Sequence, residues 1–246
     1  MNPRSSDQEQ ADMVSIPPLG LPGILAVPDG AAGIVVFAHG SGSSHLSPRN
    51  AAVAATIREA GLASLLFDLL TPQEAQDRAN VFNIPLLADR LDSAIRFVRA
   101  GRRTTGLRVG LFGASTGAAA ALVSAGRDAG RMSGAAAGCE QGPTLETASA
   151  GGSSEPVSAV VSRGGRPDLA GDMLRAVRAP TLLIVGGDDG HVLALNRAAR
   201  REMICETELT VIPGASHLFE EPGAMEEVAR LASQWFTRHA GRPRHA

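Results

Sequence analysis

Three side chains, Ser115, Asp189 and His217, have the types and the chain order that nucleophilic hydrolysis requires. Ser115 is the centre of segment 113–117, Gly-Ala-Ser-Thr-Gly, which directly follows the apolar run 108–112 and precedes an Ala-rich segment. A strand, a sharp turn and a helix in this order lift a serine hydroxyl above the edge of a sheet. Because a serine hydroxyl is a weak nucleophile until a base takes its proton, the pattern calls for a histidine and for a carboxylate that orients it.

The later part of the chain supplies both groups in that order. Asp188 and Asp189 follow one apolar run, and His217 follows the next. The other histidines precede the nucleophile, adjoin the acidic pair or lie near the C-terminus, so His217 is the best candidate for the base. Aspartate is also a favoured helix N-cap, and the segment from Val192 has a helical pattern, so capping is the alternative for either aspartate. We predict that Asp189 orients His217, with Asp188 as the alternative.

A tetrahedral oxyanion needs two backbone N–H donors, one of them from the residue after the nucleophile, which here is Thr116. Segment 39–44, His-Gly-Ser-Gly-Ser-Ser, follows another apolar run and offers Ser41 as the second donor. The alternative for such a loop is phosphate binding, but no G-K-[ST] follows and His45 stands where G-x-G-x-x-G needs its third glycine. The sequence therefore predicts an oxyanion hole at Ser41 and Thr116.

Charged side chains follow several of the apolar runs. Arg163 could bind a substrate carboxylate. Alternatively, Arg163 or Arg166 could stabilise the turn that contains them by binding loop carbonyls or Asp168. We expect Arg49 and Asp68 to form internal ion pairs. No cysteine or histidine cluster has zinc spacing, and two adjacent aspartates are too few ligands for a hard cation, so no metal is expected.

The fold follows from alternating patterns. Continuous apolar runs of the kind found in strands covered on both faces lie at 34–38, 63–67, 109–112, 157–162, 181–185 and 209–212. Segments of helical period separate several of them, and two antiparallel strands are expected near 14–16 and 20–27. This order predicts a three-layer αβα sandwich around a mostly parallel, doubly wound sheet of about eight strands, with ligands at the carboxyl ends of the strands.

Domain bounds follow from composition. We expect a disordered tail over 1–12, a single domain over 13–239 and a frayed end over 240–246. Within the domain, Gly, Ala and Ser dominate segment 127–156 without an apolar period, which predicts a flexible surface insert.

Composition limits the partners. The 246 residues carry a net charge of −2 and 3% aromatic residues, which gives no cationic field and few stacking platforms for nucleic acid. No apolar stretch is long enough to span a membrane, so no membrane partner is expected. Two distant cysteines and a polar start without a signal-like segment favour the cytoplasm.

Seven segments together resemble the α/β-hydrolase superfamily, and within it the dienelactone hydrolase-related proteins, over 14–239. They are AHGSGSS at 38–44, SPRN at 47–50, LLFDLLTP at 65–72, FGASTGAAAAL at 112–122, SRGGRPDLAG at 162–171, PTLLIVGGDD at 180–189 and PGASHLFEEPG at 213–223. The resemblance implies acyl-enzyme chemistry on a carboxylic ester or lactone without a cofactor, with Ser115, Asp189 and His217 at the catalytic positions.

Two features depart from that family. Dienelactone hydrolases proper have cysteine where this chain has Ser115, and similar proteins have a shorter segment in place of 127–156. Proteins of this type also occur joined to phosphoribosyltransferase domains, which makes such a unit a possible partner. Two other interpretations stay open: a fold-retaining binding or interaction protein without activity, and an acyltransferase that uses the same nucleophile.

Overall fold

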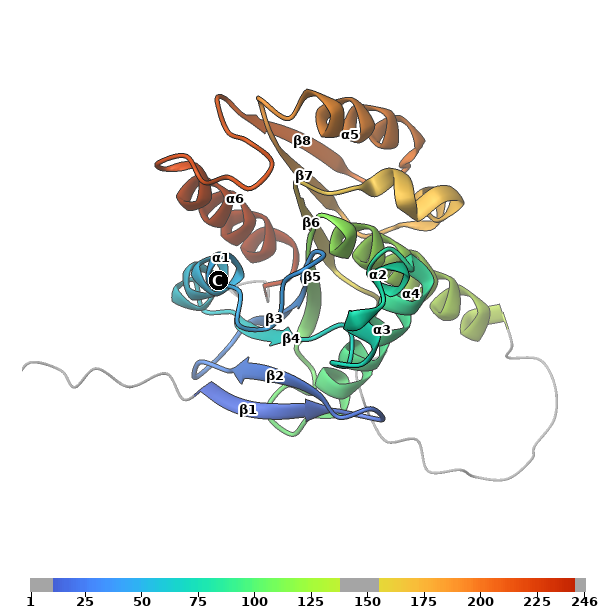
Figure 1. Ribbon diagram of the computed structural model, residues 1–246. Helices are drawn as coiled ribbons and strands as arrows, with labels where there is room; N and C mark the ends of the chain where they lie inside the picture. Colours follow the sequence, from blue (N-terminus) through green and yellow to red (C-terminus); the bar gives the residue numbers. More distant parts are fainter. Residues whose placement is uncertain (1–10, 138–154, 242–246) are drawn as a thin grey trace, which may run out of the picture.

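The apolar runs form one sheet of eight strands (Figure 1). The computed structural model describes residues 11–137 and 155–241, and of 132–137 only the backbone. The strands are β1 (Ala11–Ile16), β2 (Leu21–Ala26), β3 (Gly33–Ala38), β4 (Ala63–Phe67), β5 (Arg108–Ala114), β6 (Ala159–Arg163), β7 (Thr181–Gly186) and β8 (Thr207–Ile212). Their order is β1-β2-β4-β3-β5-β6-β7-β8. Strand β2 is antiparallel to both of its neighbours, β1 and β4, and the other neighbouring pairs are parallel, which confirms the predicted, mostly parallel sheet.

Helices cover both faces of this sheet (Figure 1). They are α1 (Pro48–Glu59), η1 (Glu74–Gln76), α2 (Arg78–Val81), α3 (Ile84–Ala100), α4 (Thr116–Ala137), η2 (Pro167–Ala176), α5 (Gly190–Glu202) and α6 (Ala224–His239). The helices α1 and α6 pack on one face, whereas α3, α4, α5 and η2 lie on the other. The αβα sandwich is therefore confirmed. The elements η1, α2 and η2 were not predicted. The first two have only 3 and 4 residues, too few to show an apolar period, and η2 is interrupted at Gly171, whose φ of 53° is not helical.

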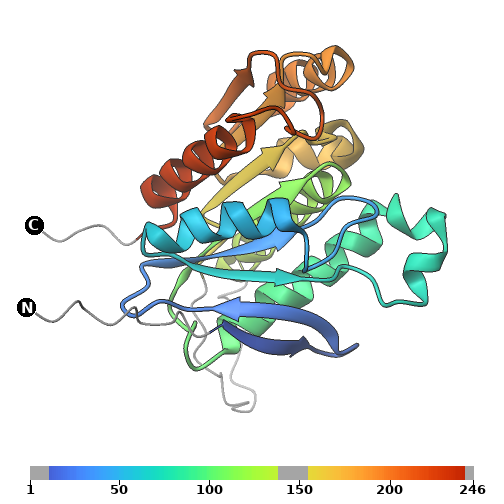
Figure 2. The same cartoon turned by 60° about the vertical axis from the view of Figure 1, so that its left-hand side comes forward.

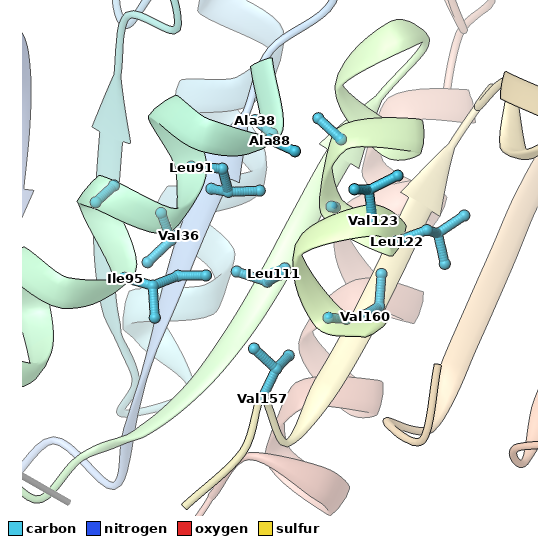
Figure 3. Close-up of a cluster of buried hydrophobic side chains, with 14 of the residues drawn as sticks. Val36, Ala38, Ala88, Leu91, Ile95, Leu111, Leu122, Val123, Val157 and Val160 are labelled. Atoms are coloured by element: carbon cyan, nitrogen blue, oxygen red, sulfur yellow. The ribbon is translucent and has the colours of Figure 1, made fainter. Parts of the chain in front are cut away.

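Successive residues of the central strands point to opposite faces, and both faces are buried. Leu111 of β5 packs in the core under α3 and α4, while its neighbour Phe112 packs in the core under α1 and α6. Figure 3 shows the first of these cores, where Leu91 of α3 and Leu122 of α4 meet the sheet. Burial on both faces explains why these strands have continuous apolar sequences.

Three predicted boundaries were wrong. Segment 127–156 was expected to be an insert, but α4 continues through Ala137, and only 138–154 lie outside the described residues. Strand β1 begins at Ala11, inside the expected N-terminal tail. Ala240 is buried rather than frayed, because the backbone of β3 at Gly33 packs directly against it.

Charged side chains account for the unexpected length of α4. The Asp128 carboxylate is almost fully buried and accepts two hydrogen bonds from the Arg99 guanidinium of α3, at 2.9 and 2.8 Å. It also accepts the backbone N–H of Val157 at 2.9 Å. Burial by itself would raise the pKa of Asp128, but Arg99 and the Val157 N–H outweigh burial and hold that pKa below 3.8. One carboxylate thus joins α3, α4 and the residues that lead into β6.

Asp128→Asn should lower the free energy of unfolding by about 3 kcal/mol, because it leaves the partly buried Arg99 without the buried carboxylate that is its counter-charge. Asp89→Asn is the matched control: its carboxylate is 61% exposed and pairs with Arg127 at 2.8 Å. This surface pair should contribute about 1 kcal/mol or less. Urea unfolding measures both values, and equal losses in the two variants would contradict this account.

The Asp128 carboxylate should make the free energy of unfolding depend on pH in the acid range. Because its native pKa is depressed, the contribution of Asp128 is present above pH 3.8, the ordinary value, and is lost as the pH falls toward the native pKa. The stability gap between wild type and Asp128→Asn should therefore narrow on acidification below that pH. A gap that stays constant or widens would show that the carboxylate charge is not what holds α4.

Candidate active site

Ser115 lies between the end of β5 and the start of α4 in a strained backbone conformation. Its φ of 51° falls in the left-handed region, which residues other than glycine rarely adopt. Three backbone hydrogen bonds hold it there: its N–H donates to Arg163 O at 3.2 Å, and its carbonyl accepts the N–H groups of Ala118 at 3.1 Å and Arg166 at 3.2 Å. This is the nucleophile-elbow geometry that the five-residue motif predicts.

The two glycines of the motif are needed because the backbone segments approach closely. A Cβ atom at Gly113 would lie 2.7 Å from the backbone nitrogen of Ala118, and one at Gly117 would lie 2.5 Å from the carbonyl oxygen of His39. Neither neighbour is a flexible side chain, so neither can move aside. The glycines therefore allow α4 to begin directly against the ends of β3 and β5.

Asp189 and His217 lie on the loops after β7 and β8 and contact each other directly. His217 Nδ1 is 2.7 Å from Asp189 Oδ2. Since a carboxylate only accepts, Nδ1 carries the proton and Nε2 is left as the basic nitrogen. Asp189 Oδ1 accepts the N–H of Val192 at 3.2 Å and so also caps α5. Orienting the histidine and capping the helix, which the sequence posed as alternatives, belong to one side chain.

Asp188 contacts the loop after β8 through its backbone, whereas Asp189 does so through its side chain. The backbone N–H of Asp188 donates to the carbonyl of Ala215 at 3.0 Å and so ties the loop after β7 to the loop after β8. The same two loops touch at Gly186, where a Cβ atom would lie 2.5 Å from the carbonyl oxygen of Ser216. These contacts bring the carboxylate of Asp189 to the imidazole of His217.

One residue lies next to both halves of the candidate triad. A Cβ atom at Gly164 would lie 3.5 Å from His217 Nδ1, and the preceding carbonyl, of Arg163, accepts the N–H of Ser115. Within the described residues, no hydrogen bond joins Ser115 Oγ to His217. In enzymes generally, catalytic hydrogen bonds are often long or poorly aligned in the free protein and tighten only in the complex.

A cavity of about 490 Å³ opens next to Ser115, and neither Ser115 nor His217 is among the residues that line it. The cavity reaches Gly40, where an added Cβ atom would lie 3.0 Å from Ser115 Cβ. The loop 39–44 and Thr116 line it, so both predicted oxyanion donors, Ser41 and Thr116, border one space. Thr116 is the first residue of α4, where backbone N–H groups lack helical acceptors and the helix dipole favours negative charge.

The part played by His39 in this loop was not predicted from the sequence. Its Nε2 accepts the N–H of Leu69 at 3.0 Å, so Nδ1 is the protonated nitrogen and donates to the Gly40 carbonyl at 2.9 Å. Burial lowers the pKa of His39, which keeps the ring neutral and the acceptor available. His39 thereby fastens the loop that carries Ser41 to the end of β4. Its position, between a strand and the first glycine of the loop, was the available signal.

Arg163 is buried without a carboxylate partner within the described residues. It is 9% exposed, and its Nη1 lies 3.8 Å from Met225 Sδ. Burial, and then the charge of Arg49, lower the pKa of Arg163 to about 10. It does not line the cavity, and the turn is held instead by Arg166, which pairs with Asp168 through hydrogen bonds of 2.9 and 2.7 Å. Substrate binding by Arg163 stays a prediction.

The other two charged residues, Asp68 and Arg49, both have side-chain partners. Asp68 Oδ1 accepts the ring Nδ1–H of His45 at 2.9 Å and its backbone N–H at 2.6 Å. Arg49 pairs with Glu220 at 3.2 Å, but at the surface rather than inside the protein as expected. Over 11–137 and 155–241, no group of three or more acidic, histidine or cysteine side chains could hold a metal ion. In that same part, no helix has the length and apolarity to cross a membrane.

The chain is similar to a solved dienelactone hydrolase from Anabaena variabilis. The two are 48% identical, the match covers 95% of this chain and 98% of the other, and the TM-score is 0.80. Est1E from Butyrivibrio proteoclasticus matches with a TM-score of 0.69 over 93% of this chain and 98% of its own. At 13% identity, that second likeness shows the fold alone. No model of a protein family matches the chain.

Curated relatives come from two strains of Mycobacterium tuberculosis and are named "putative phosphoribosyl transferase". Each is 52% identical over 222 residues, which is 90% of this chain but 44% of the relative. The chain thus spans less than half the length of these relatives.

Gly117→Ala should lower the free energy of unfolding by about 2 kcal/mol, because the added methyl group overlaps backbone that cannot shift. Gly130→Ala, in the same helix with open space around its Cβ position, should instead raise it by about 0.5–1 kcal/mol. Urea midpoints of the two variants provide the comparison. A Gly117→Ala variant as stable as wild type would show that close approach does not explain the motif.

Proposed function

The chain belongs to the dienelactone hydrolase family of α/β hydrolases, and on that premise we propose that it is a serine hydrolase of carboxylic esters or lactones. The observation that carries this proposal is the 2.7 Å hydrogen bond between Asp189 and His217 at the strand ends where Ser115 also lies. A binding module would have no need for an oriented base beside a strained serine.

The first step forms an acyl-enzyme. His217 Nε2 takes the proton of Ser115 Oγ as this oxygen attacks the ester carbonyl carbon, and the carbonyl π electrons move onto oxygen. The backbone N–H groups of Ser41 and Thr116 stabilise the resulting oxyanion. Asp189 holds the ring orientation and stabilises the imidazolium.

Collapse of this intermediate breaks the bond to the leaving oxygen, which takes the proton from His217 and departs as an alcohol. In a lactone, that alcohol stays attached to the acyl group. A water molecule then gives a proton to His217 Nε2 and attacks the acyl carbon. Collapse of the second intermediate releases the carboxylic acid and returns the proton to Ser115 Oγ.

The name of the M. tuberculosis relatives describes proteins more than twice as long as the match. We therefore assign ester hydrolysis to the matched part and keep a phosphoribosyltransferase unit as a proposed partner. Assaying the present chain for phosphoribosyl transfer tests this division. Transfer activity that depends on Ser115 would contradict it.

Wild-type protein should react with a fluorophosphonate probe at Ser115 and hydrolyse 4-nitrophenyl esters. Ser115→Ala should give no adduct and lower kcat by at least about 10⁴-fold, since the oxyanion hole alone retains only residual catalysis. Peptide mapping by mass spectrometry locates the adduct. An equal adduct on Ser115→Ala, or no adduct on folded wild type, would contradict the proposal.

The two functions of Asp189 can be separated by substitution. Asp189→Asn can still cap α5 but cannot hold His217 in the required tautomer, so kcat should fall about 10⁴-fold with little change in stability. Asp189→Ala should lose the same activity and about 1 kcal/mol of stability as well. Asp188→Asn is the matched control and should keep wild-type kcat. A larger loss of kcat in Asp188→Asn than in Asp189→Asn would reassign the orienting acid.

A further inference from the structure

The cavity beside Ser115 has one polar wall and one apolar wall. The polar wall is the loop 39–44 with Thr116. The apolar wall is Leu69, Leu70, Pro72, Ala75, Val81, Phe82 and Leu87. Of its charged neighbours, Asp68 is already engaged by His45, and Arg78 is exposed to solvent. Such a wall can contact the hydrocarbon part of a substrate but presents no fixed polar group to it.

The positions of the oxyanion donors and of His217 indicate whether this cavity binds the acyl part or the alcohol part of an ester. Ser41 and Thr116 border the cavity, whereas His217 and the loop 213–223 do not. In the proposed reaction, His217 must protonate the leaving oxygen, so the alcohol lies on the His217 side of Ser115. The acyl group then extends to the opposite side, along the oxyanion donors and into the cavity.

Segment 72–83, called the cap below, closes the apolar wall. Figure 2 shows that it projects beyond the carboxyl ends of β3 and β4. Glu74 fixes it at the base: its carboxylate accepts Arg90 Nη2 of α3 at 2.6 Å and the Thr71 N–H at 2.9 Å. Phe82 of the cap is 54% exposed although it lines the cavity. Its ring has apolar surface that a bound hydrocarbon would cover.

We propose that this cavity is the acyl site, that the acyl group is a hydrocarbon chain of medium length, and that Val81 and Phe82 of the cap set the longest chain accepted. The inference rests on the proposed ester hydrolysis. A volume of about 490 Å³ suits such a chain, since pockets of a few hundred Å³ bury most of a small ligand. Each methylene buried in the transition state should raise kcat/KM by about fourfold until the cavity is full.

The test compares 4-nitrophenyl esters from acetate to decanoate, followed by acetates of alcohols of increasing length. Wild-type kcat/KM should rise with acyl length to a medium chain and then fall. Val81→Trp should shift the optimum to shorter acids and lower kcat/KM about fourfold for each methylene displaced. Ala75→Leu, at an exposed cap position on the same wall, should also shift the optimum to shorter acids. Phe82→Ala should shift the optimum to longer acids.

Leu46→Trp is the matched control, because Leu46 is 65% exposed, follows the oxyanion loop and does not line the cavity. It should leave the acyl optimum unchanged. An acyl optimum that none of the cap variants moves would overturn the inference while leaving ester hydrolysis intact, and so would a shift seen only in the alcohol series. Failure of the proposed function looks different: wild type would then hydrolyse no ester of either series, and both proposals would fall.

Discussion

The close approach of α4 to the ends of β3 and β5 is the constraint on which the site depends. It requires positions without side chains at Gly113 and Gly117, and it holds Ser115 between them in the left-handed region. A residue held at such an angle costs about 1–3 kcal/mol and persists only where the surrounding structure fixes it. Here that structure is the buried sheet below and the backbone hydrogen bonds around Ser115.

The other parts of the site follow from parallel topology. Because β3, β5, β7 and β8 run the same way, the residues that follow them all come to one edge of the sheet. Two polar anchors then fix the loops at that edge. His39 fastens the loop 39–44 to the end of β4, and Asp189 both caps α5 and holds His217. The cavity is lined by the loop 39–44 and Thr116, whereas His217 lies outside its lining.

The parts of this architecture that depend on local pattern were predictable. Continuous apolar runs gave the strands, and residue type and chain order gave the contact between Asp189 and His217. The end of α4 was missed because the Asp128 and Arg99 charges, rather than an apolar period, stabilise it. The cap was missed because its helices are short and polar, and the Glu74 contact with Arg90 spans 16 residues. Neither contact leaves a periodic signal in sequence.

A crystal structure of the protein after reaction with an alkyl phosphonate that mimics the tetrahedral intermediate tests the proposed site most directly. Phosphorus should be bonded to Ser115 Oγ, with one phosphonyl oxygen within about 2.7–3.1 Å of the Ser41 and Thr116 nitrogens. His217 Nε2 should face the leaving-group side, and the alkyl chain should lie against the cap. A phosphonyl oxygen that points away from both nitrogens, or an imidazole turned from the phosphorus, would contradict the central claim that these loops form one catalytic site.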